Sequence, residues 1–155
     1  MPDKATVDRA KQDLREGKIP STAAGEFVHE ELEHIREGAH GARSSKQAIA
    51  IGLSKARRAG VPLKPPTKEQ TSARTRRSAK QDLEVGQQER EPRAPSKKRG
   101  KAIEGVLQRE GRQAASKKAL SAQAKSASRG RKTTARKTAA RRAAATRKAT
   151  RGPRR

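Results

Sequence analysis

Pairs of basic residues recur near the C-terminal end of the sequence, and they are the clearest candidates for chemistry. The array RKTTA RKTAA RRAAAT RKATR covers residues 131–151. In a helix, a five-residue step turns about 140° and advances about 7.5 Å, so the charge would spiral around the rod and leave no apolar face. Such a segment cannot pack into a core, but it can lie along a phosphate backbone and fold as it binds. The residues expected to contact phosphates, acting together, are Lys97, Lys98, Arg99, Arg131, Lys132, Arg136, Lys137, Arg141, Arg142, Arg147 and Lys148.

The chemistry expected of these residues is the displacement of counterions from a polyanion. Residues 96–155 hold 21 basic and 2 acidic side chains. If six to ten phosphate contacts form, affinity should fall roughly a thousandfold or more between 50 and 200 mM salt. Base-specific readout needs a rigid reading element, and neither zinc-finger spacing nor heptads behind a basic region are present. Phe27 is the only aromatic residue, too few for a platform on which bases stack. Duplex DNA is therefore the expected partner, and RNA is a further candidate.

A second candidate for anion binding lies in the N-terminal half. The expected start of a helix after Gly41 would offer free backbone amides beside two cations, and one phosphate could be seated there. The alternative is a purely structural capping box formed by Ser44 and Gln47. The same helix could also be the reading helix of a helix-turn-helix, beginning with Ser45, Lys46 and Gln47. The residues of the possible phosphate site are Arg43, Ser44, Ser45 and Lys46.

The sequence predicts neither a metal site nor an active site. His29, Glu30 and His34 are spaced HExxxH rather than HExxH, which places the two imidazoles about 140° apart on a helix. Cysteine is absent, which excludes disulfides and thiolate ligands. No nucleophile, base and orienting group are grouped as catalysis requires, so we expect no enzyme and no cofactor. Five glutamates are predicted to form the wet face of a helix or a dock for the basic tail: Glu26, Glu30, Glu31, Glu33 and Glu37.

The composition argues against a large core. Of the 155 residues, 30% are hydrophobic and 36% are charged, and the formal net charge is +24. Burial of so small an apolar area compensates for only a small part of the entropy lost on folding, and the excess of positive charges makes parts of the chain repel one another. Neither a signal peptide nor an apolar stretch of about eighteen residues is present. We therefore expect no membrane association and a cytoplasmic location in the nucleoid.

Glycine, proline and serine predict where helices begin and end. One helix is expected from a cap at Asp3 to about Glu16, a second from Pro20 to Gly38, and a third from a cap at Ser44 to Gly60. The apolar stripe of the second helix is Phe27, Val28, Leu32 and Ile35, and that of the third is Ile49, Leu53 and Ala56, with Ile51 to one side. Residues 67–91 and 97–128 are rich in helix-forming residues and are expected to be partly helical without tertiary support.

The predicted fold class is mainly α, with a small module of two or three helices followed by a largely disordered or isolated-helix basic tail. A homodimer could complete the core of this module. The expected divisions are an N-terminal helical arm over residues 1–18, a small helical domain over 19–66, a polar linker with partial helix over 67–95, and a tail rich in Ala, Lys and Arg over 96–155.

Residues Ser21 to Leu63 resemble a small bacterial domain of unknown function. The portions HIREG (His34 to Gly38), GARSSKQAIAIGLS (Gly41 to Ser54) and KARRAG (Lys55 to Gly60) carry this resemblance. Members commonly carry basic extensions and tend to be described as DNA-binding, so the resemblance implies the same here. Residues 96–155 are also similar in composition to the tails of linker histones and of bacterial histone-like proteins.

These observations predict a histone-like, nucleoid-associated protein that binds DNA without sequence preference and compacts it by neutralising phosphates. One alternative is an RNA- or ribosome-associated basic protein, because a polycation distinguishes RNA from DNA poorly. Another is a protein-interaction adaptor with a basic localisation tail.

Overall fold

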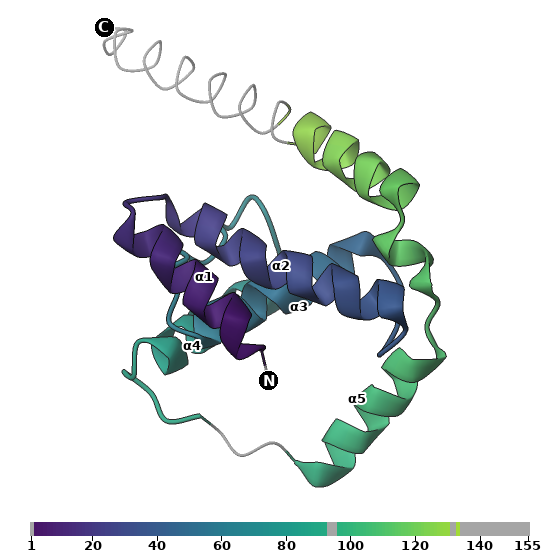
Figure 1. The fold of residues 1–155 in the computed structure, drawn as a ribbon, viewed down its shortest axis with the longest axis horizontal. Coiled ribbons are helices and arrows are strands. Elements are labelled where there is room, and N and C mark those ends of the chain that lie inside the picture. The colour runs from purple at the N-terminus through teal and green to yellow at the C-terminus, as the bar shows by residue number, and fades with distance from the viewer. Residues whose placement is uncertain (1, 93–95, 131–132, 134–155) are drawn as a thin grey trace, which may run out of the picture. The chain divides into compact units, whose positions relative to one another are not determined.

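The computed structural model describes residues 2–92, 96–130 and 133, and no β-strand occurs among them (Figure 1). The predicted mainly α fold is confirmed. The chain divides into two compact units, residues 1–120 and 121–155, and the packing described below lies within the first. Its elements are α1 (Lys4–Arg15), α2 (Pro20–Glu37), α3 (Ser45–Arg58), α4 (Ala73–Gly86), α5 (Lys97–Arg109) and the 3₁₀ helix η1 (Arg112–Ala115). Residues 117–130 are also helical.

Local sequence signals account for the helix boundaries, and the three predicted helices are confirmed to within two residues. Pro20 occupies the first position of α2, where its missing N–H costs nothing. Gly38 ends α2 in the left-handed conformation, with φ of 85°, and its N–H donates to the carbonyl of His34. The Ser44 side chain caps α3 by accepting from the N–H of Gln47 at 3.2 Å. Asp3 precedes α1 as predicted, but its side chain forms no capping hydrogen bond.

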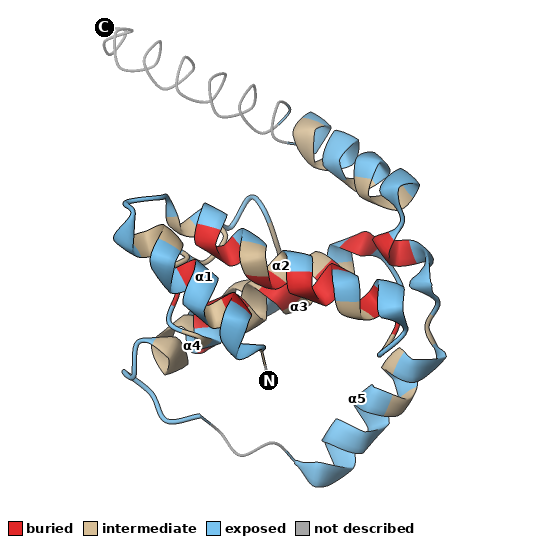
Figure 2. Cartoon of the chain, viewed as in Figure 1, coloured by how far each residue is buried: buried red, intermediate tan, exposed pale blue. Residues whose placement is uncertain are grey.

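The core is built mainly from alanine. Nine of the thirteen buried apolar residues in the described chain are alanines, and Phe27 and Ile35 are the largest fully buried apolar side chains. Figure 2 shows the buried residues where α1, α2 and α3 face one another. One cluster contains Ala10, Ala23, Ala24, Phe27, Ala56 and Val61, and the other contains Leu32, Ile35, Ala42, Ala48, Ala114 and Ala115.

The packed region extends beyond the module that the sequence predicted. Helix α1 packs on α2, α4 packs on α3, and η1 packs on both α2 and α3. Residues after Thr67 were expected to lack tertiary support, yet Ala79, Ala114 and Ala115 are buried. The physical reason is that small residues bring backbones together without forming an apolar stripe that stands out in the sequence.

Helices α2 and α3 touch almost backbone to backbone. A Cβ atom at Gly52 would lie 2.7 Å from the Cα of Val28 and 2.9 Å from the carbonyl oxygen of Phe27. The face that α3 buries is therefore the row of small residues Ser45, Ala48, Gly52 and Ala56. Of the apolar positions predicted for this helix, Ala56 is buried, whereas Ile49 and Leu53 are half-buried and Leu53 packs against the core.

Ion pairs join the helices where apolar contact is scarce. The Lys55 ammonium on α3 lies 2.7 Å from Glu31 Oε2 on α2. Asp82 fastens α4 to α3 by accepting from Ser54 Oγ at 2.6 Å and from Arg58 Nε at 2.7 Å. The prediction that the α2 glutamates form a wet face is wrong for Glu30 and Glu31, which are 5% and 1% exposed.

Among the described residues, no helix combines the length and the apolar character that a membrane crossing requires.

The close approach of α2 and α3 can be tested with two glycines that differ only in surroundings. Gly25, inside α2, has nothing within 4 Å of the place where a Cβ would sit, whereas Gly52 faces the α2 backbone. Gly25→Ala should raise the free energy of unfolding by about 0.5–1 kcal/mol through helix propensity. Gly52→Ala gains the same propensity but must push the helices apart, so it should be less stable than Gly25→Ala by about 1–3 kcal/mol. Urea denaturation followed by circular dichroism measures both, and equal stabilisation would contradict the packing.

Candidate nucleic-acid interface

Helix α5 presents the first predicted contact residues on its exposed N-terminal turn. Ser96 caps the helix by accepting from the N–H of Arg99 at 3.5 Å. Lys97, Lys98 and Arg99 follow in the first turn, and all three are exposed. Within the described residues, no ion pair engages any of them.

Those three cations stand at the end of the helix where positive charge is least favourable. The N-terminus of a helix carries a partial positive charge, so each cation there costs about 0.3–1 kcal/mol. Three adjacent cations also repel one another. Helix stability therefore gives no reason for this cluster, whereas a phosphate placed against it would satisfy both the cations and the helix end.

Among the described residues, the hydrogen bond that joins α5 to the rest of the first unit lies at the C-terminal end of the helix. The N–H of Gly41, in the loop between α2 and α3, donates to the carbonyl of Leu107 at 2.8 Å. Arg43 Nε lies 3.7 Å from a Glu110 carboxylate oxygen. No α5 residue is buried, and Ile103 and Val106 are 56% and 44% exposed. The cationic first turn is thus free to meet a ligand.

The basic sequence continues beyond a short anchored segment. In η1, Ala114 and Ala115 are buried, and Arg36 Nε donates to the carbonyl of Ala115 at 3.2 Å. Lys117 and Lys118, which follow η1 in the first unit, are exposed. In the second unit, Lys125 and Arg129 are exposed and one helical turn apart, an arrangement that is unfavourable for like charges until an anion compensates them. The predicted contacts Arg131, Lys132, Arg136, Lys137, Arg141, Arg142, Arg147 and Lys148 lie outside the described residues.

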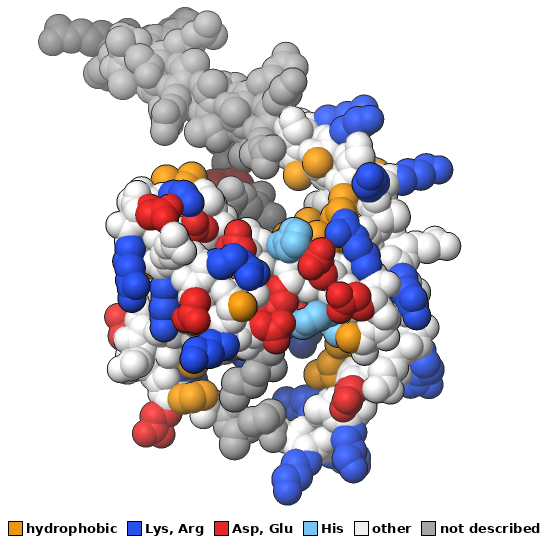
Figure 3. Space-filling view, in the orientation of Figure 1, with side chains coloured by type: hydrophobic (Ala, Val, Ile, Leu, Met, Phe, Trp, Pro, Cys, Tyr) orange, Lys and Arg blue, Asp and Glu red, His pale blue; other side chains and the backbone are white. Residues whose placement is uncertain are grey.

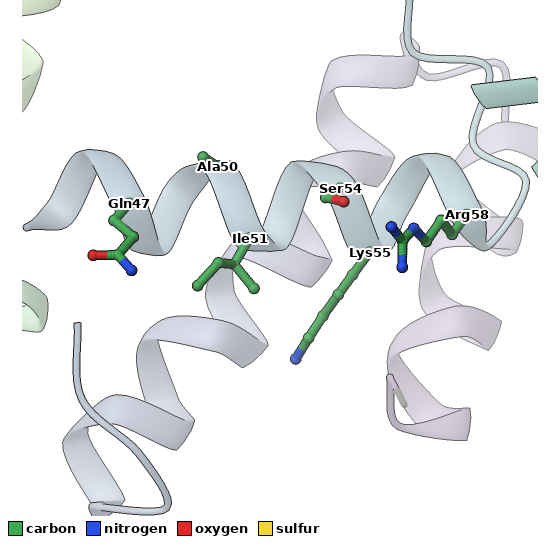
Figure 4. A pocket seen from close by; sticks show the side chains of 6 residues that line it. All are labelled: Gln47, Ala50, Ile51, Ser54, Lys55 and Arg58. Atoms are coloured by element: carbon green, nitrogen blue, oxygen red, sulfur yellow. The ribbon is translucent and has the colours of Figure 1, made fainter. Parts of the chain in front are cut away.

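Many cations of the helical module, by contrast, are already committed to carboxylates. A shallow hollow of about 340 Å³ lies along α3. Figure 4 shows the side chains that line it: Gln47, Ala50, Ile51, Ser54, Lys55 and Arg58. Lys55 is held by Glu31, and Arg58 by Asp82. On α1 and in the turn after it, hydrogen bonding to Glu26 raises the pKa of Arg9, and hydrogen bonding to Asp13 and Glu16 raises that of Lys18.

Of the four residues of the possible phosphate site at the start of α3, two have structural roles and two are exposed. Ser44 caps the helix, and Ser45 is buried with its hydroxyl donating to the carbonyl of Ala114. Arg43 and Lys46 remain exposed. Gln47 Oε1 accepts from the N–H of Arg43 at 3.1 Å, one residue earlier than a capping box requires. Phosphate binding at these four residues stays a prediction.

The α2–α3 pair does not have the geometry of a helix-turn-helix. That motif joins its helices by a turn of three or four residues, whereas residues 38–44 separate α2 from α3. The first residue of α3, Ser45, is covered by η1. The start of α3 is therefore not placed as a reading helix.

Residues 21–69 match the model of a family of unknown function, DUF6496. This match coincides with the resemblance found over Ser21 to Leu63, and it spans α2, α3 and the residues up to Glu69. No curated protein and no solved structure matches the chain. The helical region centred on α2 and α3 thus carries a domain of unknown function, and α5 with the basic sequence after it lies outside that match.

Replacing the cap of α3 tests the structural role of Ser44. Ser44→Ala should lower the free energy of unfolding by about 1 kcal/mol, because the N–H of Gln47 loses its acceptor. Ser21→Ala is the matched control, since Ser21 is exposed within α2. Thermal and urea denaturation provide the measurement. A Ser44→Ala variant as stable as Ser21→Ala would argue against the cap.

Proposed function

We propose that this protein binds duplex nucleic acid, in the first place chromosomal DNA, without sequence preference, and compacts it in the nucleoid. The residues that bind are the basic side chains of residues 96–155. The single observation that carries the proposal is the cluster of cations on the first turn of α5: among the described residues, Lys97, Lys98 and Arg99 are adjacent, exposed and without an ion pair, while Lys55 and Arg58 of the module are held by carboxylates. Free cations that helix stability does not explain point to an external polyanion.

Binding is driven by the release of condensed counterions. Each phosphate neutralised by Lys or Arg frees part of the ion atmosphere of the duplex, and the logarithm of the affinity then falls linearly with the logarithm of the salt concentration. Contacts to phosphate carry no information about base sequence. An exposed basic segment can follow a phosphate backbone with many such contacts, and several duplex segments held by one chain are brought together.

The position of the only aromatic residue favours duplex backbone over single strands. Proteins that grip single-stranded nucleic acid stack bases on aromatic side chains. Phe27 is the only Phe, Tyr or Trp in the sequence, and it is fully buried in the core. It cannot stack on a base without unfolding the module. Double-stranded RNA remains the competitor against which the preference for DNA must be measured.

The first-turn cations of α5 can be tested against an equal loss of charge elsewhere. The triple variant K97Q/K98Q/R99Q should bind a DNA duplex more weakly and reduce the magnitude of the salt slope by up to about 2.7, or 0.9 for each lost phosphate contact. Fluorescence anisotropy at several salt concentrations gives the slope. The control K4Q/K11Q/R15Q removes two lysines and one arginine that are exposed on α1. We expect its slope to match that of the unaltered protein. If both variants lose the same affinity and slope, binding reflects net charge and α5 holds no specific contact.

A chain that ends at residue 130 tests how much of the binding to DNA depends on the basic residues after that position. Residues 131–155 hold eleven basic and no acidic side chains. Their removal should shift retardation of duplex DNA in a gel to higher protein concentration and flatten the salt slope. Competition with duplex RNA, measured on both chains, gives the preference between the two polymers. An unchanged slope would place binding entirely within residues 1–130.

A further inference from the structure

Two histidines and a buried carboxylate meet beside the start of the loop after α2. Glu31 and His34 are three residues apart and share one face of α2. The chain reverses at Gly38, and His40 returns to the same place, with its ring centre 6.3 Å from that of His34. The candidate ligand atoms of Glu31, His34 and His40 all lie within 4.8 Å of one another. Histidine and acidic side chains are seen together on this face in Figure 3.

The hydrogen bonding of His40 turns a lone pair toward the carboxylate. His40 Nδ1 lies 3.2 Å from the carbonyl oxygen of Gly41. A carbonyl only accepts, so Nδ1 must carry the proton, and in neutral imidazole Nε2 is then an acceptor. Nε2 lies 3.4 Å from Glu31 Oε1, which is also an acceptor. Two such acceptors face each other favourably when a positive charge lies between them, either a proton on Nε2 or a bound metal ion. Donation of the other ring N–H to a backbone carbonyl is also how metal-bound histidines are usually oriented.

The local charge favours a cation beside Glu31 Oε1. Glu30 and Glu31 are at least nine-tenths buried, and two of their carboxylate oxygens, Glu30 Oε2 and Glu31 Oε1, have neither a hydrogen-bond partner nor an ammonium beside them among the described residues. Asp3 adds a third carboxylate, 3.7 Å from His34 Nε2. The Lys55 ammonium sits 2.7 Å from Glu31 Oε2 and 3.5 Å from Glu30 Oε1. The pKa of Arg9 is raised by its hydrogen bond to Glu26 and also by the charges of Glu30 and Asp3. Glu31 Oε1 is held by neither of these cations, and a buried carboxylate oxygen without a partner is costly, so a cation beside Glu31 Oε1 would be stabilised.

From this geometry we infer that Glu31, His34 and His40 form a binding site for a divalent transition metal ion, with zinc as the best fit. Two imidazole nitrogens and one carboxylate oxygen are ligands that Zn²⁺ accepts, and a fourth position is left for water or for Asp3. Ligand atoms around tetrahedral zinc lie about 3.3 Å apart, as bonds of about 2.0–2.1 Å dictate. The side chains of His34 and His40 are 28% and 21% exposed, so rotation of the imidazoles can close the remaining distance. Lys55 would hold the second oxygen of Glu31 from outside the metal.

Zinc binding can be measured on the full chain by titration calorimetry after removal of metals with a chelator. We expect one Zn²⁺ per chain, a rise in melting temperature on adding zinc, and visible absorption bands when Co²⁺ replaces it. His34→Ala and His40→Ala should each weaken binding by at least about tenfold, the loss caused even by an outer partner of a metal site. Circular dichroism of the variants, with His34→Gln and His40→Gln as milder replacements, shows that the fold is kept.

The third histidine of the chain supplies the matched control. His29 is exposed on α2, lies 3.7 Å from Glu33 and takes no part in the cluster. His29→Ala should bind zinc as tightly as the unaltered protein, and Mg²⁺, which prefers oxygen ligands, should not compete. The inference is overturned if the unaltered chain binds no zinc, or if His29→Ala loses as much affinity as His34→Ala. Because nucleic acid is absent from these measurements, the outcome does not depend on the proposed function.

Discussion

The close approach of helix backbones is the constraint on which the structure depends. With a core made mostly of alanine, each contact buries little area, and helices gain enough van der Waals contact only when they lie very near one another. Gly52 allows this between α2 and α3, and Gly86 allows it between α4 and the carbonyl of Arg57. Gly41 plays the same part where the α2–α3 loop meets the backbone of Glu110. A side chain at any of these positions would meet backbone atoms, which have little freedom to move.

Ion pairs reinforce these alanine-rich interfaces between helices. The cations that form no such ion pair stay free. Lys55 bridges α3 to the buried glutamates of α2, and Asp82 holds α4 through Arg58. Carboxylates thus hold the helices of the module together through ion pairs. Glu30 and Glu31 nevertheless each keep an oxygen without a hydrogen-bond partner. On α5, no carboxylate of the described residues forms an ion pair with the first-turn cations. The chain therefore combines a helical module whose helices are joined by ion pairs with two further features: the exposed cations of α5, which we propose to bind phosphate, and the cluster of Glu31, His34 and His40, which we propose to bind a metal ion.

Local signals in the sequence were enough to place the helices, because caps and stops act within a few residues. Pro20, Gly38 and Ser44 mark boundaries through backbone conformation and a single hydrogen bond. The apolar spacing of α3 indicated its buried face only in part, because hydrophobicity marked Ile49, Leu53 and Ala56 whereas the short interhelical distance buries Ala48, Gly52 and Ala56. Likewise, Ala114 and Ala115 joined the core because they are small enough to fit against α2, which no apolar periodicity reveals.

The sequence by itself determined the mainly α fold, the helix boundaries and the strong basic bias of residues 96–155. These depend on composition and on interactions between near neighbours. Only the tertiary structure decided that Glu30 and Glu31 are buried, that Lys55 neutralises them in part, and that His40 returns beside His34. The HExxxH pattern pairs His34 with His29, which lies on another side of α2 and takes no part in the cluster. The pairing of His34 with His40 depends on the reversal at Gly38 and on the hydrogen bond that the Gly41 N–H donates to Leu107, a residue 66 positions away. Contacts between residues so distant along the chain are set by packing, which local sequence patterns do not encode.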